Sequence, residues 1–176
     1  LDGIRDEIDA LCLPEIEKAV ALTSLILAMD EVDSTLGHFT SYLKDWSSRS
    51  YKEMRLKVPK IFENTEENVV LKGDIFDSMK NIAVDFAYLD PPYGSNNEKM
   101  PPSRVRYASY YHVWATICKN DKPPVFGAAL RREDTSDRVA ATVFEEFRKD
   151  NDGHFIAVKA IEKLIQNGNA KYVALR

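Results

Sequence analysis

The stretch Val84-Asp85-Phe86-Ala87-Tyr88-Leu89-Asp90-Pro91-Pro92-Tyr93 decides the fold of this chain. Its first six residues are mostly apolar, with β-branched and aromatic side chains, which predicts a buried strand. Asp90-Pro91-Pro92 then ends the strand, because proline has no backbone N–H to donate to a ladder. Ligands bind beyond the carboxyl ends of strands in open α/β sheets, so we expect a binding site at this point.

Further elements are predicted on both sides of this strand. The run Val69–Leu71 predicts a second buried strand that ends at Gly73-Asp74, and Tyr172–Leu175 predicts a third. Apolar residues recur at helical spacing from Phe155 to Asn167-Gly168, which predicts an amphipathic helix. Strands that alternate with helices are typical of an α/β protein, so the predicted fold class is α/β with a mostly parallel sheet flanked by helices.

The N-terminal third of the chain is predicted to be helical. Apolar residues at helical spacing predict one helix over residues 2–12 and another that begins at Pro14. Phe39, Leu43 and Trp46 suggest one further helical face.

The composition is that of a soluble globular protein, with 44% hydrophobic and 30% charged residues in a chain of 176. The net charge of −4 alone argues against a nucleic-acid partner. The charges are segregated, however: residues 1–40 hold nine acids and two bases, and residues 44–60 hold six bases and two acids. A basic stretch of this kind suits contact with phosphate, or forms an ordinary solvated face, and both interpretations stay open.

Metal and membrane partners are not expected. Cys12 and Cys118 lie far apart, and no Cys/His cluster is present, so neither a zinc site nor a disulfide framework is predicted. The longest apolar run, near Ala19–Met29, is too short to span a membrane, and no signal segment opens the chain. We therefore expect a reduced, cytoplasmic protein.

Two short motifs resemble a known family. Asp90-Pro91-Pro92-Tyr93 after an apolar strand resembles the catalytic motif of amino-group DNA methyltransferases. Gly73-Asp74-Ile75-Phe76, one strand earlier, is similar to the motif that holds the adenine of S-adenosylmethionine in that family. Tyr111-His112 and Trp114, with Asp121-Lys122-Pro123, resemble a subgroup of adenine-specific enzymes of restriction–modification systems.

The resemblance implies a Rossmann-like methyltransferase fold that is incomplete in this chain. Residues 1–60 would form a helical lead-in packed on the catalytic domain, and residues 61–176 would form part of that α/β domain. The implied activity is S-adenosylmethionine-dependent, site-specific methylation of N6 of adenine in double-stranded DNA, with a cognate restriction endonuclease as a further partner. The family also has a Phe-x-Gly-x-Gly loop, which is absent from this chain. We therefore expect the chain to represent part of a longer protein.

The resemblance assigns the chemistry to Asp90, Pro91, Pro92 and Tyr93. An exocyclic amine is conjugated with its ring and is a poor nucleophile. Two acceptors aimed at its two hydrogens, the Asp90 carboxylate and the Pro91 carbonyl, would expose its lone pair. The prolines fix φ and hold that carbonyl in place. Tyr93 would offer a flat face on which an extruded base can stack.

Three residues are predicted to bind the cofactor together with Asp90. By resemblance, Asp74 would accept a hydrogen bond from the cofactor's adenine amino group, with Ile75 or Phe76 against the ring. Asp74 also fits the N-cap of a helix that begins at Ile75, so a purely structural role stays open.

Bases are interleaved with aromatic residues beyond Tyr93, which suits contact with phosphates and unstacked bases. The residues predicted to bind DNA are Lys99, Arg104, Arg106, Tyr107 and His112. The alternative is an ordinary helix whose aromatic face packs into the core, with His112 as a core histidine.

Two alternatives to adenine methylation stay open. The same motif supports N4 methylation of cytosine, although serine is commoner than aspartate at the first position in those enzymes. A truncated, non-catalytic DNA-binding relative could also have kept the fold.

Overall fold

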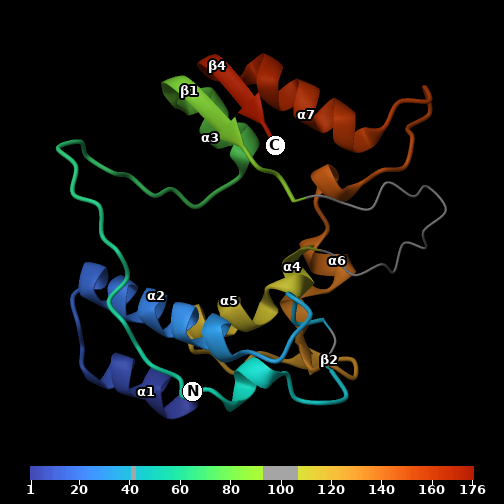
Figure 1. Cartoon of the computed structure of the whole chain (residues 1–176). Helices are drawn as coiled ribbons and strands as arrows, with labels where there is room; N and C mark the ends of the chain where they lie inside the picture. The colour runs from blue at the N-terminus through green and yellow to red at the C-terminus, as the bar shows by residue number, and fades with distance from the viewer. Residues whose placement is uncertain (41–42, 93–106) are drawn as a thin grey trace. The chain divides into compact units, whose positions relative to one another are not determined.

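The computed structural model describes residues 1–40, 43–92 and 107–176 (Figure 1). These residues form two compact units. Unit 1 comprises Leu1–Asn64 and Ala108–Ala140, and unit 2 comprises Thr65–Tyr107 and Ala141–Arg176. Each unit has its own cluster of buried apolar side chains. The division into domains at residue 60 stays a prediction.

Unit 1 is built mainly from helices and short turns. Its elements are α1 (Asp2–Ala10), α2 (Glu15–Val32), η1 (Ser48–Tyr51), α4 (Tyr107–Tyr110, which leads in from unit 2), α5 (His112–Lys119), β2 (Val125–Phe126), β3 (Arg131–Arg132), η2 (Glu133–Thr135) and α6 (Asp137–Ala140). The two helices predicted before residue 33 are confirmed, with Pro14 as the N-cap of α2. Their apolar faces meet α5 in a core that contains Ile8, Leu25 and Ile117.

The helical face predicted from Phe39, Leu43 and Trp46 is wrong. The described residues between α2 and η1 contain no helix. The Phe39 N–H donates to the Tyr110 carbonyl at 3.0 Å, and the Phe39 ring lies edge-on to Trp114. Trp46, in contrast, is 73% exposed. Contacts with α4 and α5 therefore fix Phe39 separately from Trp46, although their spacing suits a helix.

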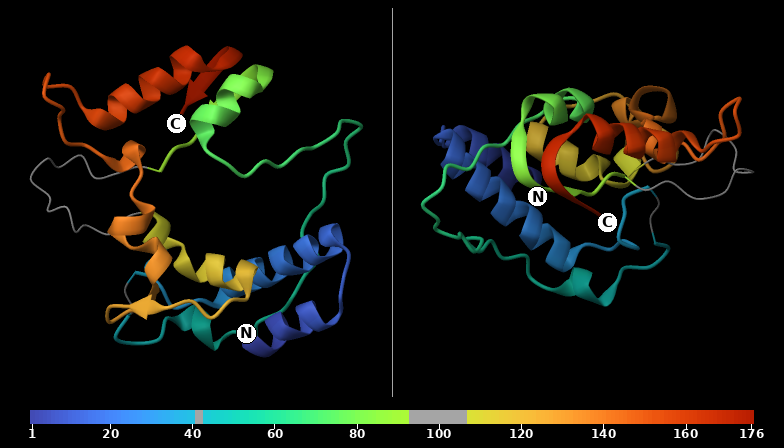
Figure 2. Two further views of the ribbon diagram at one scale, coloured as in Figure 1. Left: turned by 180° about the vertical axis from the view of Figure 1, so that it is seen from behind. Right: turned by 90° about the horizontal axis from the view of Figure 1, so that it is seen from above.

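Unit 2 holds a parallel pair of strands. Its elements are α3 (Ile75–Asn81), β1 (Ala83–Leu89), η3 (Val143–Glu145), α7 (Ile156–Asn167) and β4 (Asn169–Leu175). Strands β1 and β4 pair in parallel, with Phe86 opposite Tyr172 and Leu89 opposite Leu175. Figure 2 shows the two strands side by side, with the crossover through α7. Two of the three predicted strands and the predicted C-terminal helix are thus confirmed.

The core of unit 2 lies where β1 meets the helices. Ala87 and Leu89 of β1 are buried together with Ala160 and Leu164 of α7 and Phe144 of η3. Other side chains of the two paired strands are exposed to solvent: Phe86 is 58% exposed and its partner Tyr172 is 71% exposed.

The strand predicted at Val69–Leu71 is wrong for this structure. These residues form neither helix nor strand, and Val70 is 96% exposed. A strand needs a partner for its backbone hydrogen bonds and cover for its apolar side chains. None of the described residues pairs with this run, so its apolar composition is not sufficient to form a strand.

No helix in the described ranges combines the length and the apolar composition needed to cross a bilayer.

Candidate active site

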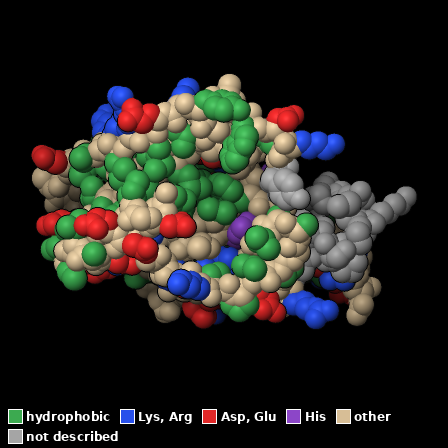
Figure 3. Space-filling model, turned by 90° about the horizontal axis from the view of Figure 1, so that it is seen from below, with side chains coloured by type: hydrophobic (Ala, Val, Ile, Leu, Met, Phe, Trp, Pro, Cys, Tyr) green, Lys and Arg blue, Asp and Glu red, His purple; other side chains and the backbone are tan. Residues whose placement is uncertain are grey.

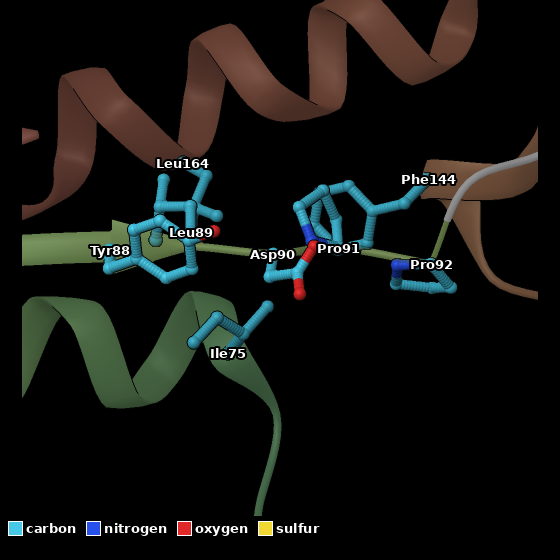
Figure 4. Close-up of a pocket in the computed structure, with 8 residues that line it drawn as sticks. All are labelled: Ile75, Tyr88, Leu89, Asp90, Pro91, Pro92, Phe144 and Leu164. Carbon is cyan, nitrogen blue, oxygen red and sulfur yellow. The ribbon is translucent and has the colours of Figure 1, made fainter. Parts of the chain in front are cut away.

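A small apolar cavity lies at the carboxyl end of β1. Its volume is about 250 Å³, which is just below the ~300–1,000 Å³ of pockets that enclose drug-sized ligands. It is lined by Ile75, Tyr88, Leu89, Asp90, Pro91, Pro92, Phe144 and Leu164 (Figure 4). All of these residues belong to unit 2.

Local sequence explains why Asp90 lies at the edge of this cavity. Strand β1 ends at Leu89, because Pro91 and Pro92 cannot donate to a ladder. The Arg176 N–H still donates to the Leu89 carbonyl at 3.1 Å, so the pairing extends to the last strand residue. The Asp90 side chain is 47% exposed, and its carboxylate lies 3.9 Å from the Arg176 guanidinium. The cavity therefore combines apolar walls with one carboxylate acceptor.

Helix α3 contributes Ile75 to the cavity. Figure 4 shows Ile75 on one side of Asp90, with Pro91 and Phe144 on the other. The structure therefore brings together Ile75 and Asp90–Pro92 from the sequence-predicted site. Tyr93 lies outside the described residues.

The other two predicted cofactor residues have different surroundings. The Asp74 carboxylate accepts from the Phe76 N–H at 2.8 Å and caps α3, and Asp74 is not among the residues that line the cavity. The Phe76 ring stacks on Phe144, with centroids 5.5 Å apart and planes 12° apart. The interpretation of Asp74 as the N-cap of a helix is thus confirmed, and its role in cofactor binding stays a prediction.

Sequence reasoning missed Phe144 as a wall of the cavity. Phe144 follows the N-cap Thr142 in the short helix η3 and is 8% exposed. No periodic pattern surrounds it, so its burial could not be read from the sequence. Leu164 and Tyr88 were predicted only as members of the helix and the strand, and their place at the cavity follows from the packing of α7 on β1.

The predicted DNA-binding residues are only partly described. Lys99, Arg104 and Arg106 lie outside the described residues. Tyr107 begins α4, and its N–H donates to the Glu145 carboxylate at 2.7 Å. His112 is 6% exposed, and its Nε2 lies 2.9 Å from the Phe39 carbonyl. This is the environment of a core histidine, and a DNA contact by His112 stays a prediction.

Unit 1 has a larger cavity of about 580 Å³, with polar and apolar lining residues, between α1, α5 and the segment Asn120–Arg132. Two buried cations, Arg5 and Arg132, line it. Arg5 donates to the Ile117 carbonyl and pairs with Asp9 at 2.8 Å. Because carboxylates already compensate Arg5 and Arg132, the cavity is best explained as part of the structural framework of unit 1.

Arg132 is the centre of an ion-pair cluster in unit 1. Its guanidinium pairs with both Asp121 and Asp134 and donates to the Thr116 hydroxyl at 3.2 Å. Hydrogen bonds from Arg132 lower the pKa of Asp121 and lower that of Asp134 to about 2. The same two carboxylates raise the pKa of Arg132. Among the described residues, no group of three or more His, Cys, Asp or Glu side chains could hold a metal ion.

The sequence of the chain matches one family of DNA-modifying enzymes. The profile of the D12 class N6 adenine-specific DNA methyltransferases covers residues 1–172. The chain belongs to this family, which confirms the resemblance drawn from the two motifs. The family is named for N6 adenine-specific methylation of DNA.

Similar proteins are modification enzymes. The chain is 28% identical to the modification methylase StsI of Streptococcus sanguinis over 99% of its own length and 24% of that protein. It is 29% identical to the modification methylase LlaI of Lactococcus lactis over 75% of its length and 21% of that protein. It is 27% identical to the type II methyltransferase M.NlaIII of Neisseria lactamica over 77% of its length and 39% of that protein.

The chain thus spans about a quarter of the length of the first relative and no more than 39% of any of these three. No solved structure matches the chain.

Proposed function

We propose that this chain is part of a site-specific DNA methyltransferase that transfers a methyl group from S-adenosylmethionine to N6 of adenine. The observation that carries the proposal is the position of Asp90-Pro91-Pro92 at the carboxyl end of a parallel strand, on the wall of an apolar cavity. Membership of the adenine-specific family supports adenine rather than cytosine as the target. The names of the relatives support a role beside a cognate restriction endonuclease.

The residues at the cavity suit an aromatic amine. Apolar walls that include Phe144 and Leu164 can contact the faces of the target ring. The Asp90 carboxylate accepts one N–H of the amine, and the Pro91 carbonyl, by family resemblance, accepts the other. Because both acceptors are held in place before the reaction, they stabilise the developing positive charge on nitrogen without rearrangement. The Asp90 carboxylate takes up the proton released from that nitrogen and passes it to solvent, to which its side chain is 47% exposed.

The residues at the start of α3 suit the adenine end of the cofactor. Ile75 offers an apolar contact for an adenine ring, and Asp74 offers a carboxylate next to it. The methionine end would need the Phe-x-Gly-x-Gly loop, which the 176 residues do not contain. When bound, S-adenosylmethionine supplies an electrophilic methyl group on a sulfonium.

We further propose that β1 and β4 belong to a larger, Rossmann-like sheet. Parallel sheets are normally covered on both faces, whereas Phe86 and Tyr172 are 58% and 71% exposed. Further strands and helices of a longer protein would cover these rings.

Transfer of labelled methyl groups into duplex DNA tests the proposed function. It should be measured on protein expressed from the complete gene, with the methylated base identified by mass spectrometry after digestion. Asp90→Ala should lower the rate by about 10²–10³, the usual effect of losing one preorganised contact. Asp85→Ala is the matched control, because Asp85 lies on the same strand but does not line the cavity.

Circular dichroism of both variants separates chemistry from folding. A folded Asp90→Ala enzyme with the wild-type rate would remove Asp90 from the mechanism and favour a non-catalytic DNA-binding protein. Labelled N4-methylcytosine in place of N6-methyladenine would overturn the choice of target.

A further inference from the structure

The basic segment from residue 44 to 60 is only partly neutralised in unit 1. Arg49 pairs with Asp33, Arg55 pairs with Glu53, and Lys57 pairs with Glu31. The remaining bases are Lys44, Lys52 and Lys60. Lys44 and Lys52 are exposed and have no acidic partner within the described ranges. The segment therefore keeps a net positive charge on a protein whose overall charge is −4.

Two large aromatic rings lie beside these lysines. Trp46, two residues before η1, is 73% exposed, and Tyr51, the last residue of η1, is 78% exposed. Lys44 and Lys52 are each within two residues of one of these rings. We call Lys44, Trp46, Tyr51 and Lys52 the η1 surface. Exposed rings flanked by cations are the combination that proteins use to follow a nucleic-acid backbone.

The η1 turn is held rigidly by the end of α2. The Ser47 N–H donates to the Ser34 hydroxyl at 2.8 Å, and the Ser47 hydroxyl donates to the Asp33 carbonyl at 3.1 Å. Arg49 Nε donates to the same carbonyl at 2.7 Å and pairs with the Asp33 carboxylate, whose side chain is 7% exposed. A turn fixed in this way loses little conformational entropy when its rings bind a partner.

The chemistry of the η1 surface favours DNA over a protein partner. Lysine is depleted at protein–protein interfaces, whereas lysine contacts with phosphate supply much of the affinity for DNA. Acidic side chains elsewhere would repel the duplex: α1 alone contains Asp2, Asp6, Glu7 and Asp9. Figure 3 shows a face with a broad apolar area, a group of acidic side chains at its lower left, and further acidic and basic side chains around its rim. Repulsion by the acids would direct a duplex towards the basic segment.

We propose that the η1 surface contacts the DNA substrate, with Lys44 and Lys52 on phosphates and Trp46 and Tyr51 against sugars or unstacked bases. This inference rests on the proposed DNA-directed function, and it assigns that function a contact surface in unit 1.

The lysines are tested through the salt dependence of binding. The 176-residue chain is titrated against a fluorescently labelled duplex of mixed sequence at several salt concentrations, followed by anisotropy. Each lost phosphate contact reduces the slope of log affinity against log salt by about 0.9, so Lys44→Gln/Lys52→Gln should reduce it by roughly 2. Lys18→Gln/Lys119→Gln removes the same charge from unit 1 at lysines paired with Asp9 and Asp134, and should leave the slope unchanged.

The rings are tested through affinity at one salt concentration. Trp46→Ala/Tyr51→Ala should weaken binding about 30-fold or more, the equivalent of ~1–3 kcal/mol of stacking for each of the two rings, without changing the salt slope. Val58→Ala/Ile61→Ala is the control, because these apolar side chains in the same unit are 79% and 62% exposed. All four replaced side chains are exposed, so circular dichroism should show an unchanged fold.

Three outcomes would overturn the inference. If the lysine and ring variants keep the wild-type salt slope and affinity, while protein from the complete gene transfers methyl groups, the η1 surface is refuted and the proposed function stands. A ring variant that changes oligomeric mass in light scattering but not DNA affinity would make the surface a protein interface. If protein from the complete gene neither binds duplex DNA nor methylates it, the η1 surface and the proposed function are refuted together.

Discussion

The Asp74 carboxylate accepts a hydrogen bond from the Phe76 N–H at 2.8 Å, so one side chain both caps α3 and lies beside the wall residue Ile75. The cap fixes the direction in which α3 leaves the preceding segment. It therefore also fixes where Ile75 meets Asp90 across the cavity. A structural role and a cofactor role for Asp74 are compatible, and substitutions that separate them are available.

Replacing Asp74 by serine and by alanine separates the two roles. Serine retains an N-cap acceptor, whereas alanine loses it at a cost of about 1 kcal/mol. We expect Asp74→Ala to lower the urea midpoint of unit 2 and Asp74→Ser to leave it nearly unchanged. If Asp74 also binds the cofactor, calorimetry on protein from the complete gene should show weaker S-adenosylmethionine binding in both variants. Wild-type cofactor affinity in Asp74→Ser would reduce Asp74 to a helix cap.

Arg132 should make the stability of unit 1 sensitive to acid. It lowers the pKa of Asp134 to about 2 and also lowers that of Asp121. Carboxyls with a depressed folded-state pKa stabilise the protein above the unfolded value of about 3.9 and lose that contribution as the pH falls through the folded value. We therefore expect the urea midpoint to be steady from pH 7 to 5 and to fall between about pH 4 and 2.

Arg132→Gln is the variant that tests this explanation. The carboxylates of Asp121 and Asp134 are 38% and 45% exposed, so water can solvate them when the guanidinium is lost. Tryptophan fluorescence reports on unit 1 specifically, because Trp46 and Trp114 both belong to it. The acid-induced fall should be smaller in Arg132→Gln than in the wild type. An equal fall in both proteins would assign the acid sensitivity to other carboxyls, such as Asp9.

Local patterns predicted the parts of the fold that local chemistry determines. β1 and its end at Asp90 follow from an apolar run and two prolines, and α7 follows from helical spacing with a terminal glycine. Val69–Leu71 has the same kind of apolar run, but a strand also needs a partner, and no described residue supplies one. Pairing is a long-range property that a short window cannot contain.

The candidate site was predictable to a similar extent. Asp90, Pro91, Pro92 and Ile75 were predicted from two motifs, and the structure places them around one cavity. Phe144 was not predicted, because it reaches the cavity through contacts with residues far away in sequence.

Gly168 occupies a position with no room for a larger residue. A Cβ there would lie 2.7 Å from the Met79 terminal methyl and 3.1 Å from the Leu164 carbonyl oxygen. The methionine end can move, but the carbonyl belongs to α7 and cannot. We expect Gly168→Ala to destabilise the protein by about 1–3 kcal/mol and to lower the midpoint of thermal unfolding followed by circular dichroism.

Gly3→Ala is the matched control for this substitution. Gly3 lies in α1, and no heavy atom is within 4 Å of its added Cβ. Alanine should therefore stabilise α1 by roughly 0.5–1 kcal/mol through its higher helix propensity. Opposite shifts in the two variants would identify crowding as the cause at Gly168. Equal shifts would contradict it.

Phe144 should position the ring that enters the cavity. Its side chain is 8% exposed, stacks on Phe76 and forms a wall beside Pro91 and Leu164. Phe144→Ala should lower the free energy of unfolding by about 3–5 kcal/mol. A loss of activity in that variant would not be distinguishable from a loss of folding. Phe144→Leu retains most of the apolar volume and loses the aromatic pair, which contributes about 0.5–1.5 kcal/mol beyond its buried area.

The leucine variant should therefore fold and yet react slowly. A wider cavity lets a bound ring move relative to Asp90, and a displacement of 1 Å can lower a rate by about 10²-fold. We expect a kcat for methyl transfer reduced about tenfold or more, with the KM for DNA little changed, because phosphate contacts supply most of that affinity. Phe126→Leu in β2 is the control, since Phe126 belongs to unit 1 and packs beneath Arg131. A wild-type kcat in the folded Phe144→Leu enzyme would show that this wall does not position the reacting ring.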